Sequence, residues 1–355
     1  MGGIDRQRTR CLERLDRLAG ATLDRESIQR EAIADIQRLV GFDRWCWPLA
    51  DPETLLPLGG VAEHDYGPQV PRALELEYSG SDFAAKDVLA RGAGPAESLS
   101  GETSGDLARS PRWNEVMRGV GIGDVAVVTC RDALGCWGWI EAYRDGGDRP
   151  FRDDDLEFLT SAGPALGSAL RRGLGYTPPL GRDVPEPRTT GVIVLNADLA
   201  VVSATEGARA WLDTFPLARL FAVWGILPAV LYPAAVRART GATEARALDQ
   251  VADGRWVVIE AAPLEGEGGG KIAVTLRDAT PRETFGRRCR VYGLSRRERQ
   301  VAAALLAGLD TRAATQRLYI SPHTFQDHLK SVFEKMSIHS RRELLALFSG
   351  SQDGR

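Results

Sequence analysis

Helix-boundary signals recur at short intervals between residues 295 and 344 and restrict how this part of the chain can fold. The capping-box pattern S-x-x-E begins at Ser295 and again at Ser340. Ser321 followed by Pro322 marks another helix start, and Gly308 suits a helix end. These signals predict four short helices, at residues 296–306, 311–318, 322–336 and 341–348.

The helix predicted over 322–336 has two chemically different faces. Its apolar stripe consists of Phe325, Leu329, Val332 and Met336. Its polar face carries His323, Gln326, Asp327 and Lys330. Only residues 319–321 separate it from the preceding helix, which is the tight connection of a helix-turn-helix. A polar helix face that offers hydrogen-bonding groups is what reading the DNA major groove requires.

Charge is distributed unevenly along the chain. Residues 286–349 hold twelve Lys or Arg and five Asp or Glu, a net charge of +7, whereas residues 1–285 carry −10. Lysine and arginine supply the part of DNA affinity that does not depend on base sequence. The alternative interpretation is that these charges merely form a solvated surface. The helix caps, the short connection over 319–321 and the polar face of the helix over 322–336 together favour double-stranded DNA as the partner.

These carboxy-terminal residues resemble the LuxR-type helix-turn-helix, a four-helix DNA-binding domain. The matching positions include Leu294, 297–299, Val301, Gly308, Leu309, Leu318, Ile320, Ser321, His323, Thr324, His328, Lys335 and Arg341. The resemblance implies a DNA-binding domain over 286–349. Its expected DNA-contacting residues are His323, Thr324, Gln326, Asp327, Lys330, Ser331, Lys335 and Arg341. Gln326 stands where the family usually has Lys, and residues 313–315 read Ala-Ala-Thr instead of Glu-Ile-Ala, so base preference does not carry over.

A run rich in proline and glycine over 173–188 cannot build a packed element, and it predicts a linker. A first domain, 1–172, would precede this linker, and a second, 189–280, would follow it. Both are predicted to be α+β, with antiparallel sheets flanked by helices, ahead of an all-α four-helix domain.

The first domain begins with a helix of period 3.6 over residues 28–40. Strand-like runs follow at 42–49, 55–60, 124–130 and 136–144, and then a helix at 153–171. This domain resembles a GAF domain, through the runs 42–47, 51–54, 110–113 and 136–140, with Pro150, Phe151 and Asp153–Asp155.

The second domain resembles a PAS domain. Residues 191–202 read as strand, turn and strand, and 255–261 and 271–278 read as the last two strands. Residues 265–270 form the turn between those last strands, and the apolar stretch 216–243 reads as helical.

Five tryptophans in the first domain are candidates for a ligand pocket: Trp45, Trp47, Trp113, Trp137 and Trp139. Within each of the pairs 45/47 and 137/139, the two residues are two positions apart, so they would share a strand face. Such a face is either a plain core or the wall of an apolar small-molecule site.

No catalytic, phosphate-binding or metal-binding motif is apparent, so we expect neither an enzyme nor a cofactor or metal. No stretch is long and apolar enough for a membrane span or signal peptide, so we expect a cytoplasmic protein.

The sequence predicts a dimeric one-component transcription regulator that senses a small molecule or partner, with RNA polymerase as a further partner. The alternatives are a ligand-free GAF/PAS dimerisation or interaction module tethered to DNA, and an autoinducer receptor of quorum sensing.

Overall fold

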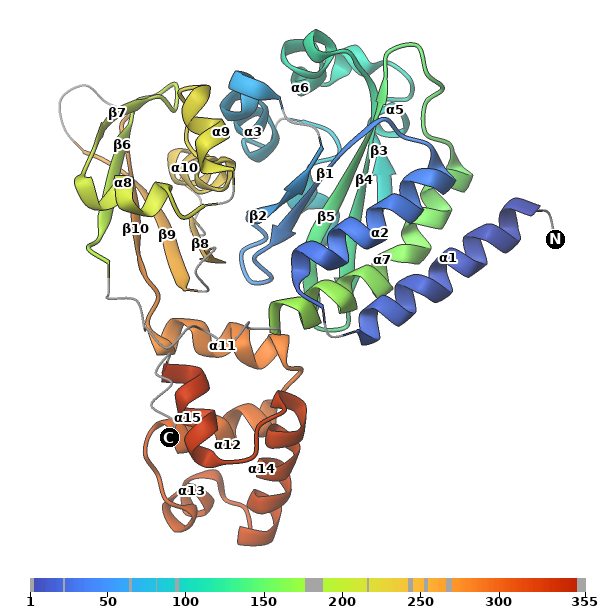
Figure 1. The fold of residues 1–355 in the computed structure, drawn as a ribbon. Helices are drawn as coiled ribbons and strands as arrows, with labels where there is room; N and C mark the ends of the chain where they lie inside the picture. Colours follow the sequence, from blue (N-terminus) through green and yellow to red (C-terminus); the bar gives the residue numbers. More distant parts are fainter. Residues whose placement is uncertain are drawn as a thin grey trace. The chain divides into compact units, whose positions relative to one another are not determined.

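The computed structural model describes residues 3–21, 23–63, 66–80, 82–92, 96–175, 188–215, 217–241, 245–251, 255–265 and 270–349. The chain forms two compact units, one of residues 1–178 and 187–278 and the other of residues 179–186 and 279–355. The first unit contains two five-stranded antiparallel sheets, and the second is helical (Figure 1). No helix in the described ranges is both long and apolar enough to cross a membrane.

The first sheet has the strand order β2-β1-β5-β4-β3. Its strands are β1 (Arg44–Ala50), β2 (Pro57–Ala62), β3 (Ala96–Ser98), β4 (Ile122–Asp132) and β5 (Gly135–Asp145). The four strand-like runs of the sequence correspond to β1, β2, β4 and β5. The three-residue strand β3 was not predicted, because so short a run shows no measurable alternation.

Helices α2 (Arg25–Val40) and α7 (Asp153–Gly175) cover one face of this sheet, and α1 (Gly3–Gly20) packs against these two helices (Figure 1). Helix α7 lies close to β4 because glycines face the strand. A Cβ at Gly163 would lie 2.7 Å from the carbonyl oxygen of Thr129. Helix α7 also continues to Gly175, three residues into the predicted linker, and residues 176–187 of that linker lie outside the described ranges.

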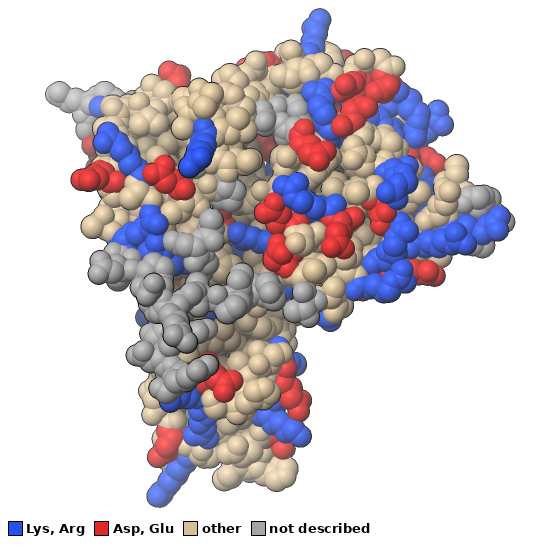
Figure 2. Space-filling view, in the orientation of Figure 1, with Lys and Arg blue, Asp and Glu red and all other residues tan. Residues whose placement is uncertain are grey.

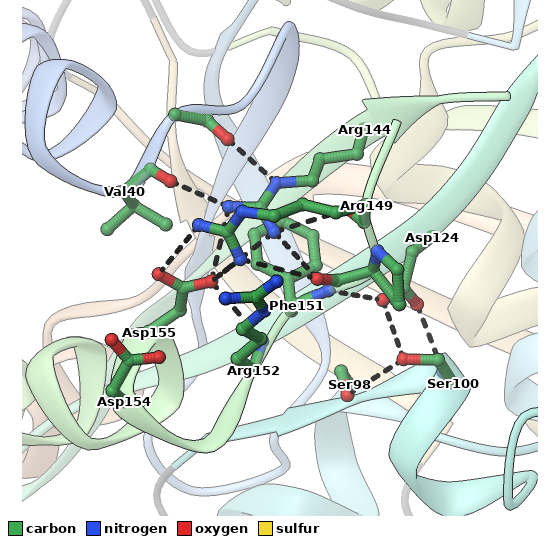
Figure 3. Close-up of polar contacts among 12 residues, drawn as sticks. Val40, Ser98, Ser100, Asp124, Arg144, Arg149, Phe151, Arg152, Asp154 and Asp155 are labelled. Carbon is green, nitrogen blue, oxygen red and sulfur yellow. Dashed lines mark hydrogen bonds and ion pairs between the residues drawn. The ribbon is translucent and has the colours of Figure 1, made fainter. Parts of the chain in front are cut away.

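The start of α7 is fixed by a buried ion pair with β5. The Arg144 guanidinium donates to the carboxylate of Asp155 at 3.3 Å and to the carbonyl oxygens of Val40 and Gly41 (Figure 3). Asp124 accepts from the backbone amide of Phe151 at 2.9 Å. Buried charges require such partners, so these contacts fix how α2, β5 and α7 meet.

The opposite face of the first sheet is covered by shorter helices. These are η1 (Gly67–Gln69), α3 (Val70–Tyr78), α4 (Lys86–Arg91), α5 (Leu99–Glu102), η2 (Leu107–Arg109), α6 (Pro111–Glu115) and η3 (Met117–Val120). Apolar side chains of α4, α5, η2, α6 and η3 join Trp139 and Tyr143 in one core, and Ala73 and Leu76 of α3 form a smaller cluster with Val116.

The second sheet has the order β7-β6-β10-β9-β8, so its five strands, counted along the chain, are arranged as in the first sheet. They are β6 (Gly191–Leu195), β7 (Val201–Ala204), β8 (Arg246–Gln250), β9 (Trp256–Pro263) and β10 (Ile272–Asp278). The helices are α8 (Glu206–Leu212), α9 (Ala218–Val223), η4 (Ala229–Leu231) and α10 (Tyr232–Arg239). Strand β8 was not predicted, and residues 266–269 of the predicted turn lie outside the described ranges.

Buried polar contacts join the two sheets within the first unit. The Asp51 carboxylate accepts from the amide of Leu248 at 2.9 Å, and Asp249 accepts from the amide of Gly59 at 3.1 Å. Arg237 of α10 pairs with Asp87 at 2.7 Å and donates to a carbonyl oxygen between β1 and β2. The two sheets therefore share a specific junction.

The helical unit contains α11 (Pro281–Val291), α12 (Arg296–Leu306), α13 (Thr311–Leu318), α14 (Pro322–Met336) and α15 (Arg341–Ser349). The last four begin at the predicted residues, and three of them also end there. Helix α11 was missed, although Thr280, Pro281 and Glu283 form a complete capping box with proline in the first turn. Cys289 of α11 packs into the same core as Phe325, Leu344 and Phe348.

Candidate nucleic-acid interface and cavity

Helix α14 is held by its apolar stripe and by its cap. Phe325, Leu329, Val332 and Met336 are all buried, as the periodicity predicted. Ser321 accepts from the amide of Thr324 at 3.1 Å and so satisfies one of the free amides of the first turn. The stripe and the cap together leave the opposite side of the helix directed away from the core.

Five of the eight predicted DNA-contacting residues are exposed on that side: His323, Thr324, Gln326, Asp327 and Lys330. The His323 Nδ1 atom lies 2.9 Å from the Asp327 carboxylate, with both side chains largely in solvent. Lys330, whose side chain is 79% exposed, lies 3.8 Å from Glu334, at the limit of an ion pair. The structure thus brings these five residues together as one accessible polar face.

The other three predicted residues make contacts within the domain. Ser331 donates to Glu298 at 2.6 Å, and the Lys335 ammonium lies 2.7 Å from the same carboxylate. Arg341 donates to the hydroxyl of Thr311 at 2.7 Å and so links α15 to α13. The sequence could not separate these roles, because pairing across 30 or more residues is not visible in local spacing.

Glu298 connects the first and third helices of this predicted four-helix domain, α12 and α14. Its side chain closes the α12 capping box by accepting from the Ser295 amide at 2.6 Å. Burial raises the pKa of Glu298, but hydrogen bonds from Lys335, Ser331 and Ser295 outweigh that effect and lower the pKa to about 2. The carboxylate is therefore charged at neutral pH and positions α14 through two of its residues.

The turn between α13 and α14 presents an exposed aromatic ring. Tyr319 has a φ of 54° and is 94% exposed. Its amide donates to the carbonyl oxygen of Gln316, which ends α13, while Ile320 packs against the core. The predicted three-residue connection is confirmed, and Tyr319 is an exposed residue next to the polar face that the sequence prediction omitted.

Figure 2 shows lysine and arginine interspersed with acidic residues on the visible face of the molecule. On α12, Arg296, Arg297 and Arg299 are exposed. On α13, Arg312 and Arg317 are exposed. The net positive charge of this unit is therefore carried by several helices, whereas α14 contributes mixed charges.

The five tryptophans do not share one face of the first sheet. Trp45 pairs with Ala142, which lies three residues from Trp139 on β5, so Trp45 and Trp139 point to opposite faces. The register between β4 and β5 shifts after Cys130, so Trp137 has no paired residue on β4. This bulge interrupts the regular alternation of side chains between Trp137 and Trp139. Trp113 is half-buried, and the other four are almost completely buried. Their assignment as ligand-binding residues stays a prediction.

A cavity of about 140 Å³ lies elsewhere in the first unit, and no tryptophan lines it. One wall comes from the first sheet and its helices: Cys46, Pro48, residues 57–62, Tyr66, Val70, Leu74, Glu77, Lys86, Glu141 and Tyr143. The other comes from the segment between β7 and α10: Phe215, Leu217, Phe221 and residues 228–230. The sequence analysis missed it because its walls come from segments that only the folded chain brings together.

The comparisons with known proteins agree on the helical unit. The family model described as "Bacterial regulatory proteins, luxR family" matches residues 293–348. A protein of Aeromonas salmonicida named "Putative HTH-type transcriptional regulator in exeN 3'region" is 49% identical over 55 residues. Residues 293–348 are therefore a LuxR-type helix-turn-helix domain.

The likeness covers only a small part of either protein. It extends over 16% of this chain and 28% of the Aeromonas protein. A solved structure, "Crystal structure of the phage VqmA-DPO complex", shares 16% identity and a TM-score of 0.19, over 50% of this chain and 88% of that chain. A TM-score this low supports no argument about the first unit.

Proposed function

We propose that this chain is a DNA-binding transcription regulator in which the sheet unit, with its GAF-like and PAS-like domains, is sensory. The observation that carries the proposal is the exposed polar half of α14, held by a buried stripe within a LuxR-type domain. A helix presented in this way can enter the major groove with its first turns toward the base edges.

Three of the exposed residues of α14 have distinct proposed roles. Gln326 has the geometry to pair with adenine, and Asp327 can accept from the cytosine amine. Lys330 is the phosphate-binding residue. Ser331, Lys335 and Arg341 act on DNA only indirectly, because their contacts with Glu298 and Thr311 position the helices.

Binding-site selection with purified full-length protein tests the DNA-reading role. Wild type should enrich one motif, and Gln326→Ala should relax it at one base position, because a good contact discriminates by roughly 1–3 kcal/mol. Gln300→Ala, on α12, is the matched control and should leave the motif unchanged. Identical motifs for all three proteins would show that α14 does not read bases.

The sensory role is a second part of the proposal. The cavity supports it, because an apolar space with a few polar groups is the common form of a small-molecule site. Homodimerisation and contact with RNA polymerase belong to the same proposal. Native mass spectrometry of freshly purified protein separates a liganded sensor from a ligand-free dimerisation module, since it reports the dimer mass and any retained molecule together.

A further inference from the structure

Three buried charged side chains that line the cavity, Glu77, Lys86 and Glu141, belong to a cluster of five. The other two members are Asp82 and Arg112, and all five are here called the buried charge cluster. All of these side chains are at most 5% exposed. Lys86 Nζ lies 2.7 Å from Glu77 and 3.0 Å from Glu141. The Arg112 guanidinium lies 2.9 Å from Glu77 and 2.7 Å from Asp82.

The buried charge cluster contains three carboxylates and two cations, so it carries one surplus negative charge. Burial works to raise the pKa of Glu77, but Lys86 and Arg112 outweigh it, and the pKa is lowered. Burial raises the pKa of Tyr143 well above its usual range, so this neighbouring phenol stays neutral. An uncompensated charge away from water is costly, and a cationic partner would remove that cost.

Glu141 is the carboxylate best placed to receive such a partner. It lines the cavity, and its buried Oε1 atom lies 3.0 Å from Lys86 Nζ, in an ion pair that lacks hydrogen-bond geometry among the described residues. Glu77, which also lines the cavity, already accepts from the ammonium and the backbone amide of Lys86. An additional donor in the cavity would therefore find its acceptor at Glu141.

The remaining walls limit the size and polarity of the occupant. Leu58 and Val61 of β2 line the space together with Phe221 and Val230, and few polar groups reach it. A cavity of about 150 Å³ lined by apolar side chains holds a molecule the size of benzene. The volume of about 140 Å³ thus admits a single ring with a short substituent.

We propose that this cavity binds a small, ring-sized amine, with the apolar ring between β2 and the η4 segment and the protonated nitrogen against Glu141. Because the walls come from both sheet domains, the occupant adds contacts across their junction. The inference deepens the proposed sensory role, and the regulatory consequence rests on that role. Binding itself is independent of it.

Calorimetric titration of the full-length protein tests the proposal with three ring-sized amines: benzylamine, cyclohexylmethylamine and 2-phenylethylamine. The alcohol and carboxylate of the same shape accompany each amine. At least one amine should bind about tenfold or more tightly than its alcohol, the effect of one charge-assisted hydrogen bond. The carboxylates should not bind. Failure of every amine to bind, or equal affinity for amine and alcohol, would overturn the proposal.

Two variants locate the site. Glu141→Gln should abolish the preference for amine over alcohol while leaving alcohol affinity unchanged, and Val230→Phe should abolish binding of both by filling the space. Glu260→Gln, an exposed carboxylate on β9, is the matched control and should bind like wild type. An unchanged amine preference in Glu141→Gln contradicts the assignment. If Glu141→Gln does not fold, Val230→Phe and the wild-type comparison still decide the question.

DNA affinity measured in the same preparations keeps the two proposals apart. A protein that binds its selected DNA but no amine overturns the cavity proposal alone. A protein that binds an amine but no DNA overturns the proposed regulator and leaves the cavity assignment standing.

Discussion

The two units of this protein place their charged side chains in opposite ways. The helical unit carries most of its charge on exposed surfaces, including Asp327 and Lys330 on α14. The sheet unit buries the five-residue charge cluster and the pair of Arg144 with Asp155. Exposed charges act on a partner through solvent and are weakened by salt. Buried charges act on their fixed neighbours, so they contribute to the shape of the fold and to ligand selection.

Two lysines of α14 show the same contrast within one helix. Lys330 is 79% exposed, whereas Lys335 is 38% exposed and bound to Glu298. The residue type is identical and the positions differ by little more than one helical turn. Their roles differ because only one of them faces another helix.

The largest effect should come from breaking the buried charge cluster. Arg112→Ala leaves Glu77 and Asp82 without one of their cations, and removing one partner of a buried ion pair costs about 3–5 kcal/mol. Arg297→Ala, on the exposed side of α12, should change stability by less than about 0.5 kcal/mol. Denaturant unfolding, with separate transitions fitted for the two units, measures both. Equal small losses would mean that the cluster contributes nothing to the fold.

Truncation of a core aromatic side chain should cost a comparable amount of stability, whereas truncation of a surface aromatic should cost little. Trp47 is completely buried, and Trp47→Ala should cost about 3–5 kcal/mol, as for a large side chain in a packed core. Tyr319→Ala removes an exposed ring and should leave thermal unfolding nearly unchanged. A Trp47→Ala protein that melts like wild type would favour the alternative, a ligand-lining tryptophan.

An intermediate effect should distinguish the two lysines of α14. Lys335→Met removes a charged hydrogen bond to Glu298 and should cost roughly 1.5–3 kcal/mol in the helical unit. Lys330→Met should leave stability unchanged but reduce the slope of log DNA affinity against log salt by about one unit. Thermal unfolding and DNA titration at several salt concentrations check the pair. The roles are misassigned if Lys330→Met unfolds more easily.

The stability of the helical unit should also depend on pH. Because folding lowers the pKa of Glu298 to about 2, its contribution is fully present well above the ordinary value of 4.5. That contribution decreases as pH falls from about 5 toward about 2, where the folded state also becomes protonated. Glu298→Gln should be less stable than wild type at pH 7, and the difference should shrink toward pH 2. A difference that is constant with pH would contradict the role of the charge.

The smallest effect should come from the exposed acid on α14. Asp327→Lys replaces a carboxylate that repels phosphate with a cation, so non-specific DNA affinity should rise and the salt slope should steepen by about 0.9. Gel-shift titration on unrelated sequences measures this, with Glu334→Lys as the control about two turns further along the helix. No change in either variant would place this surface away from DNA.

Local signals were sufficient for the helical unit. The predicted starts of α12, α13, α14 and α15 agree with the structure, because caps, proline and the apolar period act within a few residues. The same rules would have found α11 from Thr280 and Glu283. Most strands of both sheets were also predicted, whereas β3 has only three residues and β8 contains no β-branched or aromatic residue.

The order of residues along the chain specifies which segments become helices or strands and which side of α14 is polar, because these properties depend on neighbours within one or two turns. It does not specify which face of a sheet Trp45 and Trp139 occupy, since a bulge or a change of strand alters that assignment. Nor does it reveal that Lys335 meets Glu298, or that Glu141 and Val230 line the same cavity. Those pairings join residues tens of positions apart, and the packing of whole elements is what brings them within a few ångströms.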